Sequence, residues 1–384
     1  MTPLPKDIIT EILFRLQVKP LLRFQCVSKP LFALINGPYF INMHLRRSIE
    51  NNRERTLIAE ETPYSNMPRD FCGPHFYALN FSDIPNISDD DLDWAPPVKI
   101  FQPFSLPTKI KLDTAIIGCC NGLVCLHTSL CSGLYRNINP IDPSETVIWN
   151  PLIRKYKKLP FKPVENSDNY ELELAFGYDH VNDDYKVLRI LKYRNHPQVL
   201  RKVDHVYSLR THSWRIVEDQ WLYKELGSFI FSGPVSSNGA LHWVVRVEGR
   251  SLSTIVAFDL ATEKFRVHAL PCPLLQSNNI CLDVLRGWLC VCSDYDCRFT
   301  RVWVMKEYGV VSSWTPLDTL GETPIYCKPL VFSKDGKEVF MKESFRRCFW
   351  DDIKDNTLSS RLKYFKKYTL LVGSLLLLDG DSDH

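Results

Sequence analysis

The chain has 384 residues, of which 45% are hydrophobic and 24% are charged, a composition typical of a globular protein that buries a sizeable core. Its formal net charge of +3 is too small for a dedicated nucleic-acid binder, and the sequence lacks a basic stripe. Its 13 cysteines lack the spacing of a zinc site. We therefore expect reduced thiols in the core, and neither a metal nor a cofactor.

Two segments bear on where the protein is expected in the cell. Lys6 and Asp7 lie in the first turn of the first predicted helix, and no small-residue cleavage site follows, so we expect no secretory leader. The most apolar run, residues 368–378, is 11 residues long, whereas a membrane-spanning helix needs about 20. We expect a protein of the cytoplasm or the nucleus, without a membrane partner.

The first 36 residues follow a helical period. One apolar stripe contains Ile8, Ile9, Ile12, Leu13 and Leu16. It predicts a helix that ends before Gln17, a second helix that begins near Pro20, and a third over residues 30–35 that ends at Gly37. Three short helices bury little of their own surface. The stripe is therefore either a docking surface for another protein or a cap on the rest of the chain.

After about residue 55 the apolar period changes to two, which indicates strands. Strands are predicted over residues 122–127, 184–191, 240–247 and 288–293, each beside a turn signal such as Asn-Gly. Prolines separate many of these segments. A flexible loop insertion is predicted from Thr62 to Pro97, and it contains an acidic run over residues 89–93.

The strand segments also repeat. Four of them share one plan, a strand with an aromatic residue, a polar turn and a second strand: "VIWNPLIRKYKKLP", "HVYSLRTHSWRIV", "IVAFDLATEKFRVHALP" and "RVWVMKEYGVVSSWTPL". The turn glycines Gly239, Gly287 and Gly336 are 48 and 49 residues apart, which is blade spacing for a kelch-like β-propeller. About six units are predicted, and residues 368–378 should complete the first or last blade. A pair of β-sandwiches is the alternative architecture.

Catalytic motifs are missing from the sequence, which has no nucleophile elbow, phosphate-binding loop or dinucleotide fingerprint. His242, or His180 with Asp179, could be written as part of a catalytic set. Such pairs recur wherever the repeat recurs, so we interpret them as strand and turn residues. We expect a protein that is not an enzyme.

Two sets of segments resemble known families. "LPKDIITEILFRLQVKPLLRFQCVSK" resembles the F-box, while "GCCNGLVCL", "IWNPLIRKYKKLP", "FGYDHVNDDYKVLRI" and "NGALHW" are similar to the plant F-box-associated, kelch-like domain. The resemblance implies an α+β chain, with a three-helix F-box at residues 1–48, a mainly β, kelch-like propeller at 55–378 and a polar tail at 379–384.

In that family the F-box docks on a Skp-type adaptor, which joins a cullin and a RING protein, and the β domain captures a target for ubiquitination. The resemblance therefore implies a non-catalytic, substrate-recognition subunit of an SCF-type ubiquitin ligase. Two alternatives stay open. One is an S-locus F-box protein that recognises ribonucleases in pollen self-incompatibility, and the other is a propeller scaffold outside any ligase.

The same resemblance implies a set of adaptor-binding residues. By position in the motif they are Leu4, Pro5, Ile8, Ile9, Ile12, Leu13, Leu16, Leu21, Leu22, Val27 and Leu34, although some must instead hold the helices together. Gln17 stands where the family usually has proline, and Leu31 where tryptophan is common. Losing a large aromatic anchor can cost about 2 kcal/mol, so a weaker adaptor affinity is expected.

Target capture is assigned to polar loops between strands, at residues 165–170, 193–203, 219–227 and 294–300. Their aromatic or cationic side chains are of the kinds enriched at interfaces. The candidates are Tyr193, Arg194, His196, Trp221, Tyr223, Tyr295 and Arg298. The sequence identifies neither the target protein nor its degradation signal.

Overall fold

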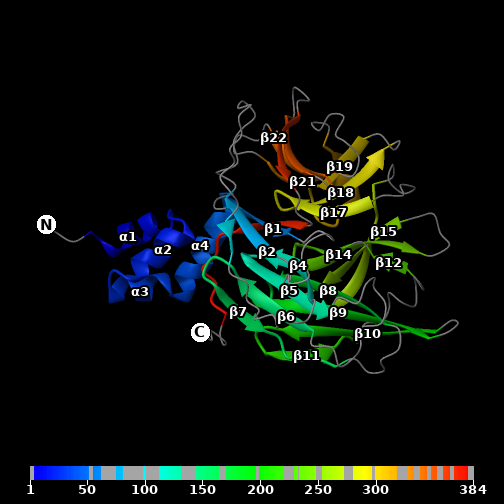
Figure 1. Cartoon of the computed structure of the whole chain (residues 1–384), viewed down its shortest axis with the longest axis horizontal. Helices are drawn as coiled ribbons and strands as arrows, with labels where there is room; N and C mark the ends of the chain where they lie inside the picture. Colours follow the sequence, from blue (N-terminus) through cyan, green and yellow to red (C-terminus); the bar gives the residue numbers. More distant parts are fainter. Residues whose placement is uncertain are drawn as a thin grey trace, which may run out of the picture.

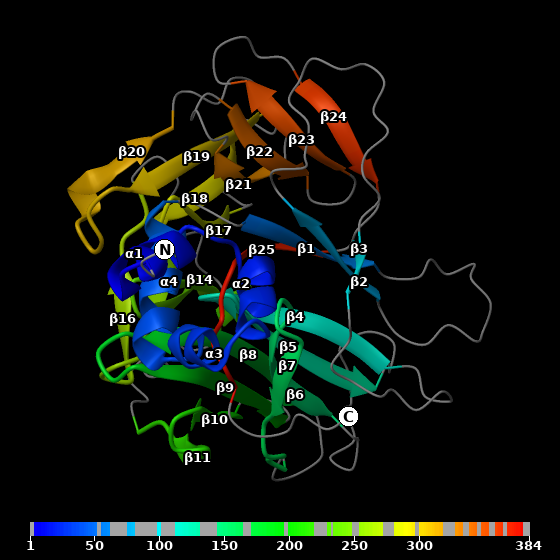
Figure 2. The same cartoon turned by 90° about the vertical axis from the view of Figure 1, so that its left-hand side faces the viewer.

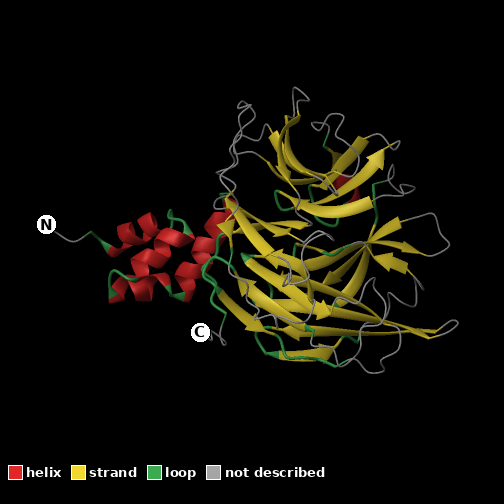
Figure 3. Cartoon of the chain, viewed as in Figure 1, coloured by secondary structure: helices red, strands yellow, loops and turns green. Residues whose placement is uncertain are grey.

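A computed structural model gives the fold of the chain. It describes residues 4–51, 55–61, 75–80, 98–100, 112–130, 144–163, 170–195, 199–218, 229–231, 233–247, 253–271, 280–295, 299–317, 327–332, 338–343, 347–352, 358–363 and 367–378. The four α-helices gather at one end of the molecule, and strands form most of the rest (Figure 3). The predicted acidic run and the polar tail lie outside the described residues.

The helices are α1 (Lys6–Leu13), α2 (Val18–Gln25), α3 (Lys29–Ile35) and α4 (Pro38–Glu50). The first three confirm the sequence-based prediction, except that α2 begins two residues before Pro20. Ser28 caps α3 by accepting a hydrogen bond from the Leu31 amide. Helix α4 was not predicted. Pro38 lies in its first turn. Backbone amides there have no hydrogen-bond partner within the helix, so the missing N–H of proline costs nothing.

The described strands form six antiparallel sheets, which we number as blades in chain order. Blade 1 contains β1 (Arg55–Glu61), β2 (His75–Asn80), β3 (Val98–Lys99) and β25 (Lys367–Val372). Blade 2 contains β4 (Leu112–Cys120), β5 (Leu123–Leu130), β6 (Glu145–Asn150) and β7 (Lys155–Lys158). Blade 3 contains β8 (Tyr170–Asp179), β9 (Asp184–Asn195), β10 (Val199–Ser208) and β11 (Ser213–Ile216).

The other three blades follow the same order. Blade 4 contains β12 (Phe229–Phe231), β13 (Val235–Ser237), β14 (Ala240–Val247), β15 (Ser253–Asp259) and β16 (Lys264–His268). Blade 5 contains β17 (Ile280–Leu285), β18 (Trp288–Tyr295), β19 (Phe299–Met305) and β20 (Trp314–Pro316), with the short helix η3 (Val311–Ser313) before β20. Blade 6 contains β21 (Cys327–Phe332), β22 (Glu338–Glu343), β23 (Arg347–Asp352) and β24 (Leu358–Lys363).

This arrangement confirms the predicted propeller, since the blades lie around one axis (Figure 2). It is not a pair of sandwiches, because each sheet is built from strands that are consecutive in the chain, apart from β25 in blade 1, and packs face to face with its neighbours. One prediction was wrong: β2 lies inside the segment from Thr62 to Pro97 that was assigned to a loop. Its pairing with β1, from Thr56 opposite Asn80 to Glu61 opposite His75, outweighs the weak local strand signal.

The repeat seen in the sequence has a structural basis in one turn. Asn150, Ser208 and Asp259 each end the third long strand of their blade, and each side chain accepts a hydrogen bond from a backbone amide of the following turn. Four residues later Arg154, His212 and Glu263 have positive φ. The same turn therefore recurs in blades 2, 3 and 4.

The ring is closed by the two ends of the chain. Strand β25, near the C-terminus, pairs with β1 from Val372 opposite Arg55 to Lys367 opposite Glu60, and it is the innermost strand of blade 1. The prediction was that residues 368–378 complete the first or last blade; residues 368–372 do so in the first blade, and residues 373–378 lie beyond the strand. The closure also hides two strand edges that would otherwise be open.

Apolar side chains fill the space between neighbouring blades. Leu188 and Trp243 belong to the layer between blades 3 and 4, whereas Cys290 and Cys292 belong to the layer between blades 5 and 6. Seven cysteines whose side chains the structure describes are free thiols. Three of them, Cys125, Cys290 and Cys292, are buried, as expected for thiols in the core.

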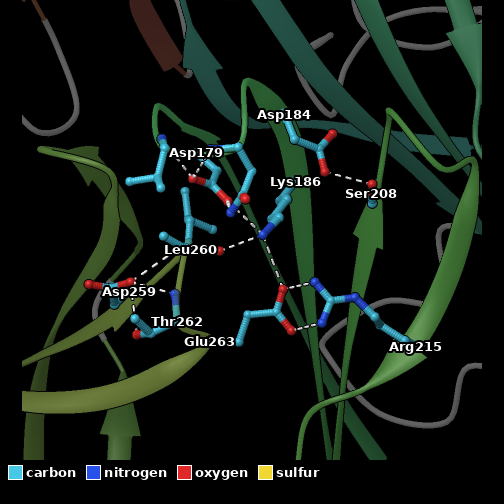
Figure 4. Close-up of polar contacts among 12 residues, drawn as sticks. Asp179, Asp184, Lys186, Ser208, Arg215, Asp259, Leu260, Thr262 and Glu263 are labelled. Carbon is cyan, nitrogen blue, oxygen red and sulfur yellow. Dashed lines mark hydrogen bonds and ion pairs between the residues drawn. The ribbon is translucent and has the colours of Figure 1, made fainter.

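A network of polar contacts crosses between blades 3 and 4 (Figure 4). The Lys186 ammonium group donates hydrogen bonds to Asp179, to the Leu260 carbonyl oxygen and to Glu263. Glu263 also pairs with Arg215. Asp179 lies in the same blade as Lys186, whereas Leu260 and Glu263 lie in the β15–β16 turn of blade 4, so the buried ammonium group links two neighbouring blades.

The propeller has two faces. On the first, which we call the helix face, the β4–β5 turn at Gly122 lies against Ser374, and the β13–β14 turn at Gly239 lies against His180 of the β8–β9 turn. The four helices lie at this end (Figure 1). Because neighbouring strands run in opposite directions, the ends of β9 and β18 lie on the other face, which we call the far face.

Candidate protein-docking surface

The helices enclose a small core of their own. Leu13, Phe14, Val18 and Leu21 are buried from α1 and α2, and Phe40 is buried from α4. The rings of Phe14 and Phe40 stack with centroids 4.7 Å apart. Helix α4 thus supplies the buried surface that three short helices could not provide alone.

Polar contacts hold α4 against α1. The Arg47 guanidinium donates two hydrogen bonds of 2.9 Å to the Glu11 carboxylate and lies 4.5 Å from the centre of the Phe14 ring. His44 Nε2 lies 2.8 Å from the Leu16 carbonyl oxygen, so the ring donates its proton there. Burial lowers the pKa of His44, which keeps the ring neutral at pH 7.

The first three helices and the residues beside them also carry large apolar side chains in contact with solvent. We call this set the outer apolar face, and it consists of Leu4, Ile8, Ile12, Phe24, Val27 and Phe32. These side chains come from α1, α2, α3 and the residues beside them, within the first 32 positions. Exposed apolar side chains gathered in one small unit mark an interaction surface.

The structure divides the predicted adaptor-binding residues into three groups. Leu4, Pro5, Ile8, Ile12 and Val27 are exposed. Ile9, Leu16, Leu22 and Leu34 are half-buried against the helical core. Leu13 and Leu21 are 3% and 0% exposed and lie in the helical core with Phe40 of α4, so they are among the residues that hold the helices together.

The two departures from the family pattern have defined places. Gln17 is exposed and precedes α2 with φ −73° and ψ 164°, a conformation that proline can adopt. Leu31 is half-buried against the helical core, and its neighbour Phe32 is 55% exposed. An aromatic side chain is therefore available to a partner one position after Leu31.

The predicted target-binding residues are only partly described. Tyr193 and Arg194 belong to β9, opposite Arg201 and Leu200 of β10, so most of the loop predicted at 193–203 is a strand pair, which extends away from the helices (Figure 1). Tyr295 ends β18 on the same far face. His196, Trp221, Tyr223 and Arg298 lie outside the described residues.

Sequence reasoning missed Phe24 and Phe32 as surface residues. A signal was present, because α3 has the sequence KPLFALI and is apolar on all sides. A helix of that kind needs partners on more than one face. Helix α4 also had a signal, in the helical spacing of Phe40, Ile41, His44 and Leu45.

Two searches of the described residues gave negative results. None of the helices that the structure assigns is long and apolar enough to cross a membrane. No group of three or more histidine, cysteine, aspartate or glutamate side chains within the described ranges is arranged to hold a metal ion.

Comparison with known proteins identifies both parts of the chain. The model of the F-box domain matches residues 2–42, and that of the F-box associated beta propeller domain matches residues 81–318. The Arabidopsis thaliana F-box protein CPR1 is 28% identical, over 94% of this chain and 84% of its own. The F-box/kelch-repeat protein At3g23880 of the same plant is also 28% identical, over 88% and 85%. The chain therefore belongs to the plant F-box proteins that carry an F-box-associated β-propeller domain.

Proposed function

We propose that this protein is the substrate-recognition subunit of an SCF-type ubiquitin ligase. In this function α1–α3 dock on a Skp-type adaptor, which connects the protein to a cullin and a RING protein. The propeller captures the target, which is then ubiquitinated and degraded by the proteasome. The two family matches support this proposal, as does the similarity to another F-box protein over most of both chains.

The outer apolar face is the observation that carries the proposal. Ile8, Ile12 and Phe32 are each about half exposed, although the helical core is complete without them. Exposed apolar side chains give up favourable burial, at about 25 cal/mol per Å² of apolar surface. A partner that covers them recovers this free energy, and the adaptor is the partner that the F-box match indicates.

In this function the chain positions the target and does not itself catalyse ubiquitin transfer. The subunit would hold its target near the ubiquitin-conjugating enzyme, which raises the effective concentration of target lysines. We place target capture on the far face, at the strand ends that carry Tyr193, Arg194 and Tyr295, because the helices occupy the other face. Connections between strands tolerate variation in length and sequence, which suits a recognition surface.

The adaptor contact is tested with a single charged substitution. Ile12→Asp places a carboxylate on the outer apolar face without opening the core, since Ile12 is 49% exposed. A buried charge at an apolar interface costs at least about 2 kcal/mol. We expect at least a thirtyfold loss of affinity for a purified Skp-type adaptor, measured by calorimetry.

Ile49→Asp is the matched control. Ile49 has the same side chain and is 48% exposed, but it lies at the end of α4 beside the propeller, so its substitution should leave adaptor affinity unchanged. Leu13 is unsuitable for this test because it is buried. If the folded Ile12→Asp protein binds the adaptor as the original does, the proposed function is wrong.

A further inference from the structure

The six residues after β25, residues 373–378, lie between the helices and the propeller, and we call them the C-terminal segment. Leu375 is buried in the helical core, together with Leu13 and Phe40. Leu376 packs both on that core and on the layer between blades 2 and 3, where Leu378 is buried. One short segment therefore takes part in two hydrophobic cores.

The backbone of this segment is held by one side chain of blade 2. Asn150 Nδ2 donates hydrogen bonds to the carbonyl oxygens of Ser374, at 3.0 Å, and Leu376, at 3.2 Å. The Ser374 hydroxyl accepts a hydrogen bond from the Leu376 amide. Asn150 and Ser374 are both fully buried, where each lost hydrogen bond leaves a costly unpaired group.

The turns beneath the segment leave no room for it to move inward. A Cβ atom at Gly122 would lie 2.3 Å from Ser374 Cβ, so the β4–β5 turn is in direct contact with the segment. Leu152 and Ile153, from the β6–β7 turn, pack on the helical core themselves. The helices are thus seated on blade 2 as well as on the C-terminal segment.

Comparison of two equivalent turns separates the roles of the Asn150 side chain. Asp259 ends β15 as Asn150 ends β6, and each Oδ1 accepts a hydrogen bond from the amide two residues later. In blade 4, which is far from the helices in sequence, the residue at this position carries a carboxylate, without an amide nitrogen. The amide nitrogen of Asn150 is therefore not needed for the turn, and both of its hydrogen bonds go to the C-terminal segment.

We propose that the C-terminal segment fixes the helices and the propeller as one rigid body, with Asn150 as the positioning residue. This inference rests on the proposed function and deepens it. The outer apolar face is held at one orientation relative to the far face, so a captured target is presented to the ligase at a fixed position. Because β25 also closes the propeller, the same segment couples closure of the ring to that orientation.

The test measures orientation directly. Spin labels are attached through non-canonical residues at Lys29 of α3 and Lys264 of β16, which are both exposed, and the distance between them is measured by pulsed electron paramagnetic resonance in the full chain. We expect one narrow distance distribution in the original protein. In Asn150→Asp, which keeps the turn acceptor but loses both donors, the distribution should widen at least twofold.

Asp259→Asn is the matched control, because it makes the reverse exchange at the equivalent turn of blade 4, and its distribution should stay narrow. Leu375→Ala gives a second variant if Asn150→Asp fails to fold, since it removes the contact with the helices and leaves the Asn150 hydrogen bonds in place. It should widen the distribution as well.

Two results overturn the inference. One is a broad distribution in the original protein, and the other is a narrow distribution in every folded variant of Asn150 and Leu375. Adaptor affinity is measured in the same samples and should be unchanged, because the outer apolar face is intact. A failure of the proposed function would appear in the Ile12→Asp experiment, independently of these distances.

Discussion

Lys186 Nζ lies 2.8 Å from Asp179 Oδ2, with the lysine side chain 4% exposed and the aspartate fully buried. Burial acts to raise the pKa of Asp179, but hydrogen bonds from Lys186 and Asn182 outweigh it, so the pKa lies below its usual value. The carboxylate is therefore charged at pH 7. The contribution of this pair to stability is complete above about pH 4 and is lost as the pH falls below that value.

We expect Lys186→Met to lower the free energy of unfolding by about 3 kcal/mol or more, because it leaves the buried carboxylate of Asp179 without its cation. Urea unfolding at pH 7 measures this change. Lys158→Met is the control, since Lys158 pairs with Glu145 at the surface, with both side chains 45% exposed. That pair should contribute less than about 1 kcal/mol. Equal losses in the two variants would contradict the assigned role of Lys186.

A second prediction concerns acid sensitivity at His242. This ring is buried between Val235, whose carbonyl oxygen lies 3.3 Å from Nδ1, and Tyr308, whose hydroxyl lies 2.8 Å from Nε2. Burial is the largest cause that lowers its pKa to about 4, with a smaller contribution from His268. The unfolded chain, with a histidine pKa near 6.5, takes up a proton between pH 6.5 and 4 that the folded chain does not. Stability therefore falls as the pH falls through this window.

His242→Gln should reduce the difference in unfolding free energy between pH 7 and pH 5 by about 2 kcal/mol. Comparing the two proteins isolates His242, because His127 and His205, whose pKa values burial also lowers to about 4, remain in both. His212→Asn, at an exposed turn position, is the control. If His242→Gln leaves the difference in unfolding free energy between pH 7 and pH 5 unchanged, protonation of His242 is not the cause of the acid sensitivity.

A third prediction concerns Gln17. Its φ of −73° is close to the value that proline fixes, and it precedes the first helical residue, so α2 does not require its amide. Gln17→Pro should raise the free energy of unfolding by about 0.4–1 kcal/mol by restricting the unfolded chain. Gln17→Ala separates the effect of the ring from loss of the glutamine side chain and should change stability little. A lower melting temperature in Gln17→Pro would refute this expectation.

The sequence was informative wherever a structural signal is local. Turn residues such as Gly122 and Gly239 and the period-two segments beside them place the hairpins correctly, since the turns require positive φ. Strand β2 was missed because its stability comes from pairing with β1 across residues rich in polar side chains and proline. Helix α4 was missed because Gly37 and Pro38 are also typical of a helix end.

The candidate site was harder to predict because its two sides are set by distant residues. An apolar stripe does not reveal which of its members face inward. Leu13 is buried because Phe40 and Leu375 cover that side of α1, while Ile12, its neighbour, is left exposed. The sequence of the first 36 residues could not predict this contact, because Leu375 lies near the other end of the chain and is brought to the helices when β25 closes the propeller.

The last prediction uses two glycines with the same backbone conformation. Gly122 and Gly287 both have φ +81°, but a Cβ atom at Gly287 would meet nothing within 4 Å, whereas one at Gly122 would lie 2.3 Å from Ser374 Cβ and 2.6 Å from the Val372 carbonyl oxygen. Replacement by alanine imposes the same left-handed strain at both sites, about 1–2 kcal/mol. Any further decrease in the free energy of unfolding of Gly122→Ala therefore results from displacement of the C-terminal segment.

We expect Gly122→Ala to lower the free energy of unfolding by at least about 2 kcal/mol more than Gly287→Ala, because overpacking against backbone cannot be relieved by a side-chain rotation. Hydrogen exchange followed by mass spectrometry locates the effect. The Leu376 amide, which donates to Ser374, should exchange faster in Gly122→Ala and at the original rate in Gly287→Ala. Similar stabilities and similar exchange in the two variants would mean that the C-terminal segment is not held against blade 2.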